Sequence, residues 1–435
     1  MLSGFGQMIV NVTDTVFLGR LNEVALGASA IGGLLLASFL MISYGFSTGM
    51  QIVIARKDGE GNRSEIGNVF WQSAYFKLFL SLMIVVVFLP FAPVFLETFV
   101  TSRTVLAACV TFITIRLLGL PFAYAISLFR GYYSGIGQTK IISIAIGSFA
   151  VLNVFLNYLL VFGNWGFPRL EIAGSAIASV ISEIVGALVF LVYTLYSKSS
   201  KEFGLNIRPP YSWEVLSEVL EISLPMMMQF FLAVGSWFAF FLIVENLGER
   251  SLAISNLVRN VYMLLMIPII AFSNTTNTVV SNLVGQNKIN EIIPTLKIIL
   301  PMNLGFTLIL VFLNLLNPSI LLGIYTNLDA VINDSITTIY IISGSIFFFA
   351  LANCCLSTVS GLGKTNVALG IEALTLVCYF LYTWLAVYVF HWSLEAVWCN
   401  EYVYFISMLI ISMLYLWRYF SKSLVHQNET SLPSA

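Results

Sequence analysis

Long apolar runs recur along the whole chain, and they constrain its fold more than any other feature. Twelve runs are separated by short gaps that carry charged residues, Gly, Pro or Asn. Each is close to the ~20 residues that a helix needs to cross ~30 Å of hydrocarbon. They lie near residues 1–19, 25–52, 68–95, 105–128, 141–163, 172–197, 222–245, 251–281, 293–317, 335–358, 367–390 and 396–417.

Charged residues are correspondingly scarce. They make up 9% of the 435 residues, and hydrophobic residues make up 59%, whereas a soluble domain carries roughly 25% charged residues. A soluble fold cannot bury so much apolar surface, so lipid is the solvent. In lipid every backbone N–H and C=O must be bonded internally, and runs of helix length without strand-like alternation favour helices over a barrel. We therefore predict an all-α membrane protein with twelve transmembrane helices.

The remaining composition excludes several classes of function. The net charge is −1, and no basic block is interleaved with aromatic residues, so nucleic acid is not an expected partner. The five cysteines lie in or beside apolar runs without the spacing of metal ligands, so we expect free thiols and neither a structural metal nor a cofactor. The two histidines, His391 and His426, lie near a run's end and in the tail. No catalytic constellation is present, and we do not expect an enzyme.

Lys and Arg set the expected orientation, because cytoplasmic connections are enriched in them. Most of the 20 Lys and Arg residues fall in connections on the side of the two termini. The opposite side receives only Arg20, Arg103, Arg169 and Arg250. We therefore predict that both termini are cytoplasmic, in a multi-pass protein of the plasma or inner membrane.

The sequence repeats itself at a constant offset of 226 residues. Residues 21–29 (LNEVALGAS) match 247–255 (LGERSLAIS) at both Leu, the Glu and the Ser, and residues 134–139 (SGIGQT) match 360–365 (SGLGKT). One offset held over four runs indicates a duplication. Since the first and seventh runs both start on the cytoplasmic side, the repeat is parallel, about an axis along the membrane normal.

The duplication divides the chain into two six-helix bundles. We expect an N-terminal bundle at 1–200, a cytoplasmic linker at 201–221, a C-terminal bundle at 222–417 and a cytoplasmic tail at 418–435. The halves should superpose by one rotation, with the substrate bound in a cleft between bundles that rock against each other.

The first run is expected to be a helix of the mature protein. It carries Asn11, Asp14 and Thr15, and no small-residue cleavage site follows it. The repeat places Pro225 opposite a position just before Met1. We therefore expect the chain to begin inside its first helix, about one or two turns short.

Several segments carry a resemblance to a known family. Residues 11–21 (NVTDTVFLGRL) resemble the first helix of multidrug and toxic compound extrusion (MATE) transporters, of the MOP flippase superfamily. The glycine turns at 131–139 and 357–365 are similar to the family's intracellular connections, and 152–157 (LNVFLN) followed by 172–179 (IAGSAIAS) resembles its fifth and sixth helices. The resemblance covers essentially the whole chain.

The resemblance implies a secondary active antiporter. MATE proteins export amphipathic, often cationic drugs or metabolites in exchange for H⁺ or Na⁺, by alternating access. The expected partners are thus a small organic molecule and membrane lipid, with no obligate protein partner. The alternative is a lipid-linked oligosaccharide flippase of the same superfamily, which usually has fourteen helices and a basic central cavity; twelve runs and few buried cations favour the exporter.

Asp14 is the first candidate for coupling to a cation. An ionised carboxylate inside a transmembrane helix costs several kcal/mol unless it is paired or hydrated, so such an acid is a functional candidate. Its repeat partner is Phe240, so the helix scaffold does not require an acid there. The alternative is a helix-end acid that faces the external vestibule.

The family's N-terminal cation site joins this acid to an Asn-x-x-x-Asp and a hydroxyl, which by resemblance are Asn153, Asn157 and Ser179. A spacing of four puts the two asparagines on one helix face, and their oxygens suit transient Na⁺ or a carboxylic acid. Asn157 replaces the family's second carboxylate, which puts Na⁺ binding in doubt. Interhelical hydrogen bonding is the alternative role.

Two further acids lie inside apolar runs. Glu183 is four residues after Ser179 and is a candidate proton relay, or else the partner of Arg116 or Lys77. Glu372 is either functional or a helix-end residue that reaches the interface. Some MATE members carry acids in the seventh and tenth helices. Here the seventh run has no acid before Glu245, and the tenth run has none. We therefore do not expect coupling through the second half.

The start of the seventh run is rich in side chains suited to promiscuous binding. Met226, Gln229 and Trp237 are candidate substrate-binding residues, because thioether and aromatic side chains adapt to varied ligands. Packing against lipid is the alternative.

Overall fold

The computed structural model is built from helices throughout, and it describes residues 2–98, 100, 102–323, 325 and 328–430. Each of the twelve predicted runs is helical. Contacts between helices divide the chain into two compact units, residues 1–231 and 232–435. The boundary falls inside α8, and the bundle and linker limits drawn from the sequence stay predictions.

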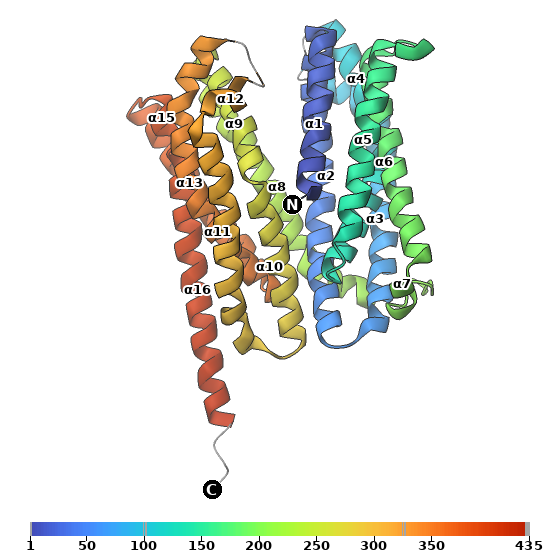
Figure 1. Ribbon diagram of the computed structural model, residues 1–435, viewed down its shortest axis with the longest axis vertical. Helices are drawn as coiled ribbons and strands as arrows, with labels where there is room; N and C mark the ends of the chain where they lie inside the picture. Colours follow the sequence, from blue (N-terminus) through green and yellow to red (C-terminus); the bar gives the residue numbers. More distant parts are fainter. Residues whose placement is uncertain (1, 99, 101, 324, 326–327, 431–435) are drawn as a thin grey trace. The chain divides into compact units, whose positions relative to one another are not determined.

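Unit 1 contains the first six predicted spans (Figure 1). α1 packs on α5, α5 on α6, and α4 on α2, α3 and α6. Its elements are α1 (Leu2–Leu21), α2 (Glu23–Gly59), α3 (Arg63–Glu97), α4 (Arg103–Gly135), α5 (Lys140–Phe162), the 3₁₀ turn η1 (Asn164–Gly166), α6 (Glu171–Tyr196), the short α7 (Lys198–Glu202) and the first part of α8 (Trp213–Glu245).

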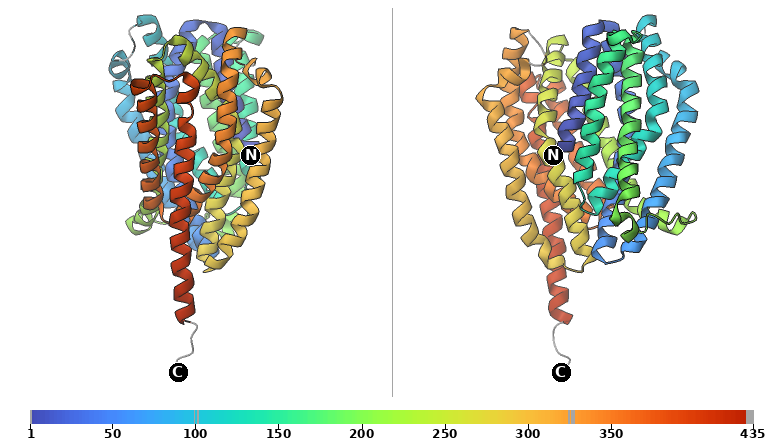
Figure 2. Two further views of the ribbon diagram at one scale, coloured as in Figure 1. Left: turned by 90° about the vertical axis from the view of Figure 1, so that its left-hand side faces the viewer. Right: turned by 45° about the vertical axis from the view of Figure 1, so that its right-hand side comes forward.

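Unit 2 contains the rest of α8 and the last five predicted spans. α13 packs on α9, α10, α11 and α16, and α14 on α16. The elements are α9 (Glu249–Leu265), α10 (Ile267–Gly285), η2 (Ile289–Glu291), α11 (Ile292–Leu316), α12 (Pro318–Gly323), α13 (Asp329–Gly361), α14 (Thr365–Trp384), the π-helical turn η3 (Leu385–Val389), α15 (Leu394–Val397) and α16 (Asn400–Thr430). In Figure 2, α16 extends beyond the other helices of its unit at one end.

The helices have the length and apolarity of membrane spans. By length and apolarity, ten helices in the described part of the chain can cross a bilayer singly, and α9 with α10, which bend by 45° at a break, make an eleventh if the pair is one span. α1 is helical as predicted but is not among these helices. Pro268 lies in the first turn of α10, beside the break, where it removes a backbone donor and favours the bend. The predicted single run at 251–281 is therefore two helices that meet at a bend.

Equivalent contacts recur in the two units, as the duplication predicts. α4 and α13 both end in a tight turn, at Gly137 with φ +72° and Gly363 with φ +79°, a backbone conformation that favours glycine. Just before these turns, a Cβ on Gly135 would lie 2.7 Å from Ile54, and one on Gly361 would lie 2.9 Å from Val280. All three pairs are 226 residues apart. Each unit thus has a close helix crossing at an equivalent glycine, between α2 and α4 in unit 1 and between α10 and α13 in unit 2.

A further close approach has no counterpart in the repeat. α2 packs on the first part of α8 at Gly49, where an added Cβ would lie 2.4 Å from the Cα of Ser223. The Ser223 hydroxyl donates to the Phe46 carbonyl at 3.2 Å. The repeat partner of Gly49 is Thr275, so this contact is specific to unit 1.

Gly49→Ala should therefore destabilise the protein by about 1–3 kcal/mol, as overpacking does. Gly33 provides the matched control on the same helix, since a Cβ there meets nothing within 4 Å. Gly33→Ala should be neutral or stabilise by roughly 0.5–1 kcal/mol, because alanine restricts the unfolded chain. Thermal unfolding of the two purified variants measures both effects, and equal midpoints would show that the α2–α8 contact is not tight.

Candidate cation-coupling site

Asp14 lies in the fourth turn of α1, on the side that packs against α5 and α6. The ring of Phe17, one turn later, lies 5.5 Å from that of Phe162 at the end of α5. The Asp14 side chain is partly buried. The packing of α1 thus directs its acid toward two other helices of unit 1.

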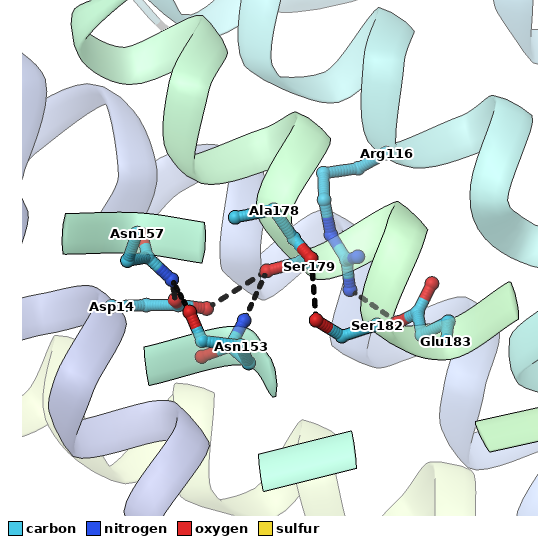
Figure 3. Close-up of polar contacts among 8 residues, drawn as sticks. All are labelled: Asp14, Arg116, Asn153, Asn157, Ala178, Ser179, Ser182 and Glu183. Atoms are coloured by element: carbon cyan, nitrogen blue, oxygen red, sulfur yellow. Dashed lines mark hydrogen bonds and ion pairs between the residues drawn. The ribbon is translucent and has the colours of Figure 1, made fainter. Parts of the chain in front are cut away.

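Both carboxylate oxygens of Asp14 accept hydrogen bonds (Figure 3). The amide nitrogen of Asn157 donates to Oδ1 at 2.8 Å. The hydroxyl of Ser179 donates to Oδ2 at 3.1 Å. The acid is therefore held by one residue of α5 and one of α6, the two helices that the sequence indicated.

Asn153 completes the arrangement. Its amide nitrogen donates to the Ser179 hydroxyl at 3.2 Å, and Asn157 also donates to the Asn153 carbonyl at 3.0 Å. Asn153 and Asn157 are fully buried, and Ser179 is 3% exposed. Four of the residues singled out from the sequence thus form one connected cluster.

Two buried acceptors in this cluster have no hydrogen-bond partner. They are the side-chain oxygens Oδ1 of Asn153 and Asn157. A buried polar atom without a partner costs about 1–3 kcal/mol, so such an atom in a native site calls for a ligand or a proton. The amide nitrogen of Asn157 donates to Asp14, and that of Asn153 donates to Ser179. The two amide oxygens without a partner therefore belong to the same cluster as Asp14.

Glu183 forms an ion pair with Arg116 beside the cluster. The Arg116 Nη2 to Glu183 Oε1 distance is 2.8 Å, and the side chains are 11% and 8% exposed. In Figure 3 the pair lies next to the Asp14 cluster, and Ser182 of α6 donates to Ala178 between them. The sequence left two roles open for Glu183, a proton relay or an ion pair with Arg116 or Lys77. In the structure its ion-pair partner is Arg116.

Arg116 is also close to Asp14, which the sequence did not indicate. Its guanidinium interacts electrostatically with the Asp14 carboxylate, while its Nη1 is buried without a hydrogen-bond partner. Arg116 therefore places a positive charge between two acids. Its signal in the sequence was its position inside an apolar run, where a cation requires a partner.

Lys77 is the other cation inside a predicted span of unit 1, and it has a different environment. It lies on α3, is 2% exposed, and its amine donates to Ser127 Oγ at 2.6 Å and to the Ser43 carbonyl at 3.3 Å. It also donates to Ser47 Oγ. Three oxygens of α2 and α4 thus solvate the amine in place of a carboxylate.

The candidate substrate-binding residues lie along α8. Met226 and Gln229 belong to unit 1 and are 4% and 9% exposed. Trp237 belongs to unit 2, where its ring stacks on Tyr262 at 5.6 Å. The role of these three residues in binding stays a prediction.

The fold and the polar cluster together agree with a match to a known family. The sequence matches the MatE family over residues 1–159 and 225–385. The chain belongs to the MatE family. It is therefore a multi-span membrane protein of a transporter family, as its sequence indicated.

Curated relatives of this MatE chain include proteins named as probable multidrug resistance protein NorM. One from Thermotoga maritima is 24% identical over 360 residues, covering 82% of this chain and 77% of the relative. One from Synechocystis is 25% identical and covers 99% of this chain and 93% of the relative. The multidrug resistance protein MdtK of Photorhabdus laumondii is 25% identical over 67% of this chain and 64% of its own length.

Solved structures share the fold of this MatE protein. A MOP superfamily transporter from Pyrococcus furiosus superposes with a TM-score of 0.88 at 19% identity, over 97% of this chain and 94% of that one. A MATE protein in complex with MaL6 gives a TM-score of 0.89 at 18% identity, over 98% and 95%. At these identities the comparison establishes the fold alone.

Proposed function

We propose that this protein is a secondary antiporter that exports amphipathic, cationic drugs or metabolites in exchange for an inward-moving cation, by alternating access. The family and the relatives named for multidrug resistance support the transport function. The observation that carries the coupling assignment is the buried cluster around Asp14. We place the protein in the plasma or inner membrane with both termini cytoplasmic.

The coupling ion that fits this cluster best is H⁺. Both oxygens of Asp14 already accept from N–H and O–H donors, so the ionised acid is stabilised without a metal. The guanidinium of Arg116 lies close enough to repel a bound metal cation. A protonated Asp14 instead needs an acceptor for its O–H, and the amide oxygens of Asn153 and Asn157 have that capacity unused.

Na⁺ is the alternative coupling ion. The same two amide oxygens, with Asp14 and the Ser179 hydroxyl, are the hard oxygen ligands that such a cation prefers. Asn157 stands where a second carboxylate is expected, so the site carries one negative charge beside the positive charge of Arg116. This charge balance favours a proton over a metal ion.

Transport by the purified protein in proteoliposomes tests the function and the ion together. We expect an imposed pH gradient, without Na⁺, to drive uptake of an amphipathic organic cation into inside-acidic vesicles. An imposed Na⁺ gradient at equal pH should drive none. Transport driven by Na⁺ alone would contradict the assignment to H⁺, and transport of neither kind would contradict the antiporter.

The flippase alternative predicts basic residues free to hold an anionic substrate. In the described part of unit 1, each of the two cations inside the predicted spans has partners, although Arg259 of unit 2 keeps a buried Nε without a hydrogen bond. Lys77 donates to three oxygens of α2 and α4, and Arg116 pairs with Glu183. This arrangement supports the exporter.

A further inference from the structure

The repeat directs attention to the place in unit 2 that corresponds to the Asp14 cluster. At the offset of 226 residues, Asp14, Asn153 and Asn157 correspond to Phe240, Tyr379 and Thr383. The Phe240 and Tyr379 rings are 6.1 Å apart, so α8 and α14 meet there as α1 and α5 meet in unit 1. The carboxylate is missing from α8, but the place is not apolar.

An acid from another helix lies at this place. Glu401, in the first turn of α16, is 3% exposed and accepts a hydrogen bond from the Tyr262 hydroxyl at 2.7 Å. Tyr379 also lies near Glu401 and interacts with it. Tyr262 is fully buried and Tyr379 is 4% exposed. The second unit thus contains a buried carboxylate in the position equivalent to the first, contributed by α16 instead of α8.

A second observation points to a ligand for this acid. Asn400, which precedes Glu401, is fully buried, and its amide nitrogen donates to the Thr383 hydroxyl at 3.0 Å. The same side chain interacts with Tyr379, the phenol that also lies near Glu401. Its Oδ1 atom is buried without a partner. The amide therefore lies within the cluster and leaves one acceptor unused, as Asn153 and Asn157 do beside Asp14.

The groups that face Glu401 are phenols. Tyr262 comes from α9 and Tyr379 from α14, and Tyr404 of α16 interacts with Glu401 electrostatically. Tyr404 itself donates to the buried Glu372 of α14. No ion pair is formed by Glu401 with any described Lys, Arg or His, and its negative charge is therefore uncompensated.

Charged groups on the neighbouring elements lie elsewhere. α13, which packs against α16, carries only Asp329 and Asp334, both exposed near its start. Arg259 of α9 lies over the ring of Phe241 at 4.9 Å. Glu245 is exposed at the end of α8.

We propose that Glu401 is a second proton-binding site, which takes up and releases one proton independently of Asp14. A buried carboxylate without a cation is far more costly than its neutral acid. Taking up a proton converts Glu401 to that acid, and Asn400 supplies an acceptor in the same cluster for the new O–H. For the transport cycle this inference rests on the proposed antiport, to which it adds a second proton per substrate.

Infrared difference spectroscopy of the whole protein in lipid tests the site without relying on transport. The spectrum between alkaline and acidic buffer should contain the carbonyl band of a buried carboxylic acid that Glu401→Gln removes. Gln keeps an oxygen that accepts from Tyr262, so this variant should fold. Glu245→Gln, which removes an exposed acid of the same unit, should leave the spectrum unchanged. If folded Glu401→Gln protein keeps every carbonyl band of the wild type, the proposal is overturned.

A milder variant covers the case in which Glu401→Gln does not fold. Tyr262→Phe removes one hydrogen bond to Glu401 and leaves the acid in place. Since hydrogen bonding sets the frequency of a carboxylic acid, we expect the band to shift and not to disappear. If the band that Glu401→Gln removes stays at the wild-type frequency in Tyr262→Phe protein, the titrating acid is not Glu401.

The same measurements separate this proposal from the proposed function. The Glu401 band should remain in Asp14→Asn protein, whatever that variant does to transport. In proteoliposomes, Glu401→Gln should lower the number of protons moved per substrate by about twofold, because one of the two proposed proton-binding acids is lost. An unchanged ratio contradicts a role in the cycle, and normal transport by Asp14→Asn contradicts only the assignment of Asp14.

Discussion

Asp14→Asn should abolish gradient-driven export and leave the protein folded. The scaffold tolerates a neutral residue at this position, since the repeat partner of Asp14 is the buried Phe240. The amide oxygen of asparagine can still accept from Asn157, and its nitrogen can donate to the Ser179 hydroxyl, in place of the two bonds that hold the acid in the native site. It cannot, however, take up or release a proton. Efflux at matched membrane expression should fall to the level of cells without the transporter, while substrate binding to the purified variant persists.

Two companions make this experiment decisive. Asn157→Ala removes the donor to Asp14 Oδ1, a bond to a charged group worth about 1.5–3 kcal/mol, and should shift the pH profile of transport without abolishing it. Asp334→Asn, which neutralises an exposed acid of unit 2, should transport as the wild type does. If Asp14→Asn pumps at the wild-type rate, the coupling assignment is wrong and Glu183 becomes the acid to test.

The sequence predicted the helices well, because the bilayer imposes a simple rule on them. A span must be long, apolar and internally hydrogen-bonded, and that requirement is visible in composition alone. The duplication was equally visible, and the twin contacts of Gly135 and Gly361 reproduce it in space. Both features depend on local sequence or on a constant offset.

Interruptions of the helices were harder to predict. The break between α9 and α10 lies inside a continuous apolar run, and Pro268 alone indicates it. Proline is common in transmembrane helices without breaking them, because neighbouring groups satisfy the freed carbonyls. Whether a given proline bends a span depends on its tertiary packing.

The candidate site was predicted in its members but not in its electrostatics. The resemblance selected Asp14, Asn153, Asn157 and Ser179, and spacing alone put the two asparagines on one face. The sequence left open whether Glu183 pairs with Arg116 or Lys77. The choice depends on three serine and carbonyl oxygens that solvate Lys77 from other helices, and no spacing rule encodes such a contact.

Glu401 was overlooked for a related reason. It follows the short gap after Phe390, where a glutamate is normally a helix-end residue in contact with water. The structure buries it against Tyr262 and Tyr379, and it also buries Glu372, which was open to the same interpretation. An adjacent Asn–Glu pair at the start of a final apolar run, beside phenols of other spans, is the signal that was available.

Glu183→Leu should lower the stability of the protein by about 3–5 kcal/mol, the usual cost of removing one partner of a buried ion pair. Arg116 is only 11% exposed in its side chain, and without Glu183 its charge loses its hydrogen-bonded partner. The double variant Arg116→Met/Glu183→Leu removes both charges at similar volume. It should recover most of the loss, because well-packed apolar residues often replace a buried pair without penalty. Thermal unfolding of the single and double variants in lipid nanodiscs measures the difference.

The transport rates of the same two variants then decide what Glu183 does. If the pair is structural, the double variant should fold and export, with a pH profile altered by loss of the positive charge beside Asp14. If Glu183 carries the proton, the double variant should fold and yet fail to export. If Glu183→Leu protein unfolds at the wild-type temperature, Glu183 does not stabilise the charge of Arg116. In that case Asp14 compensates the guanidinium.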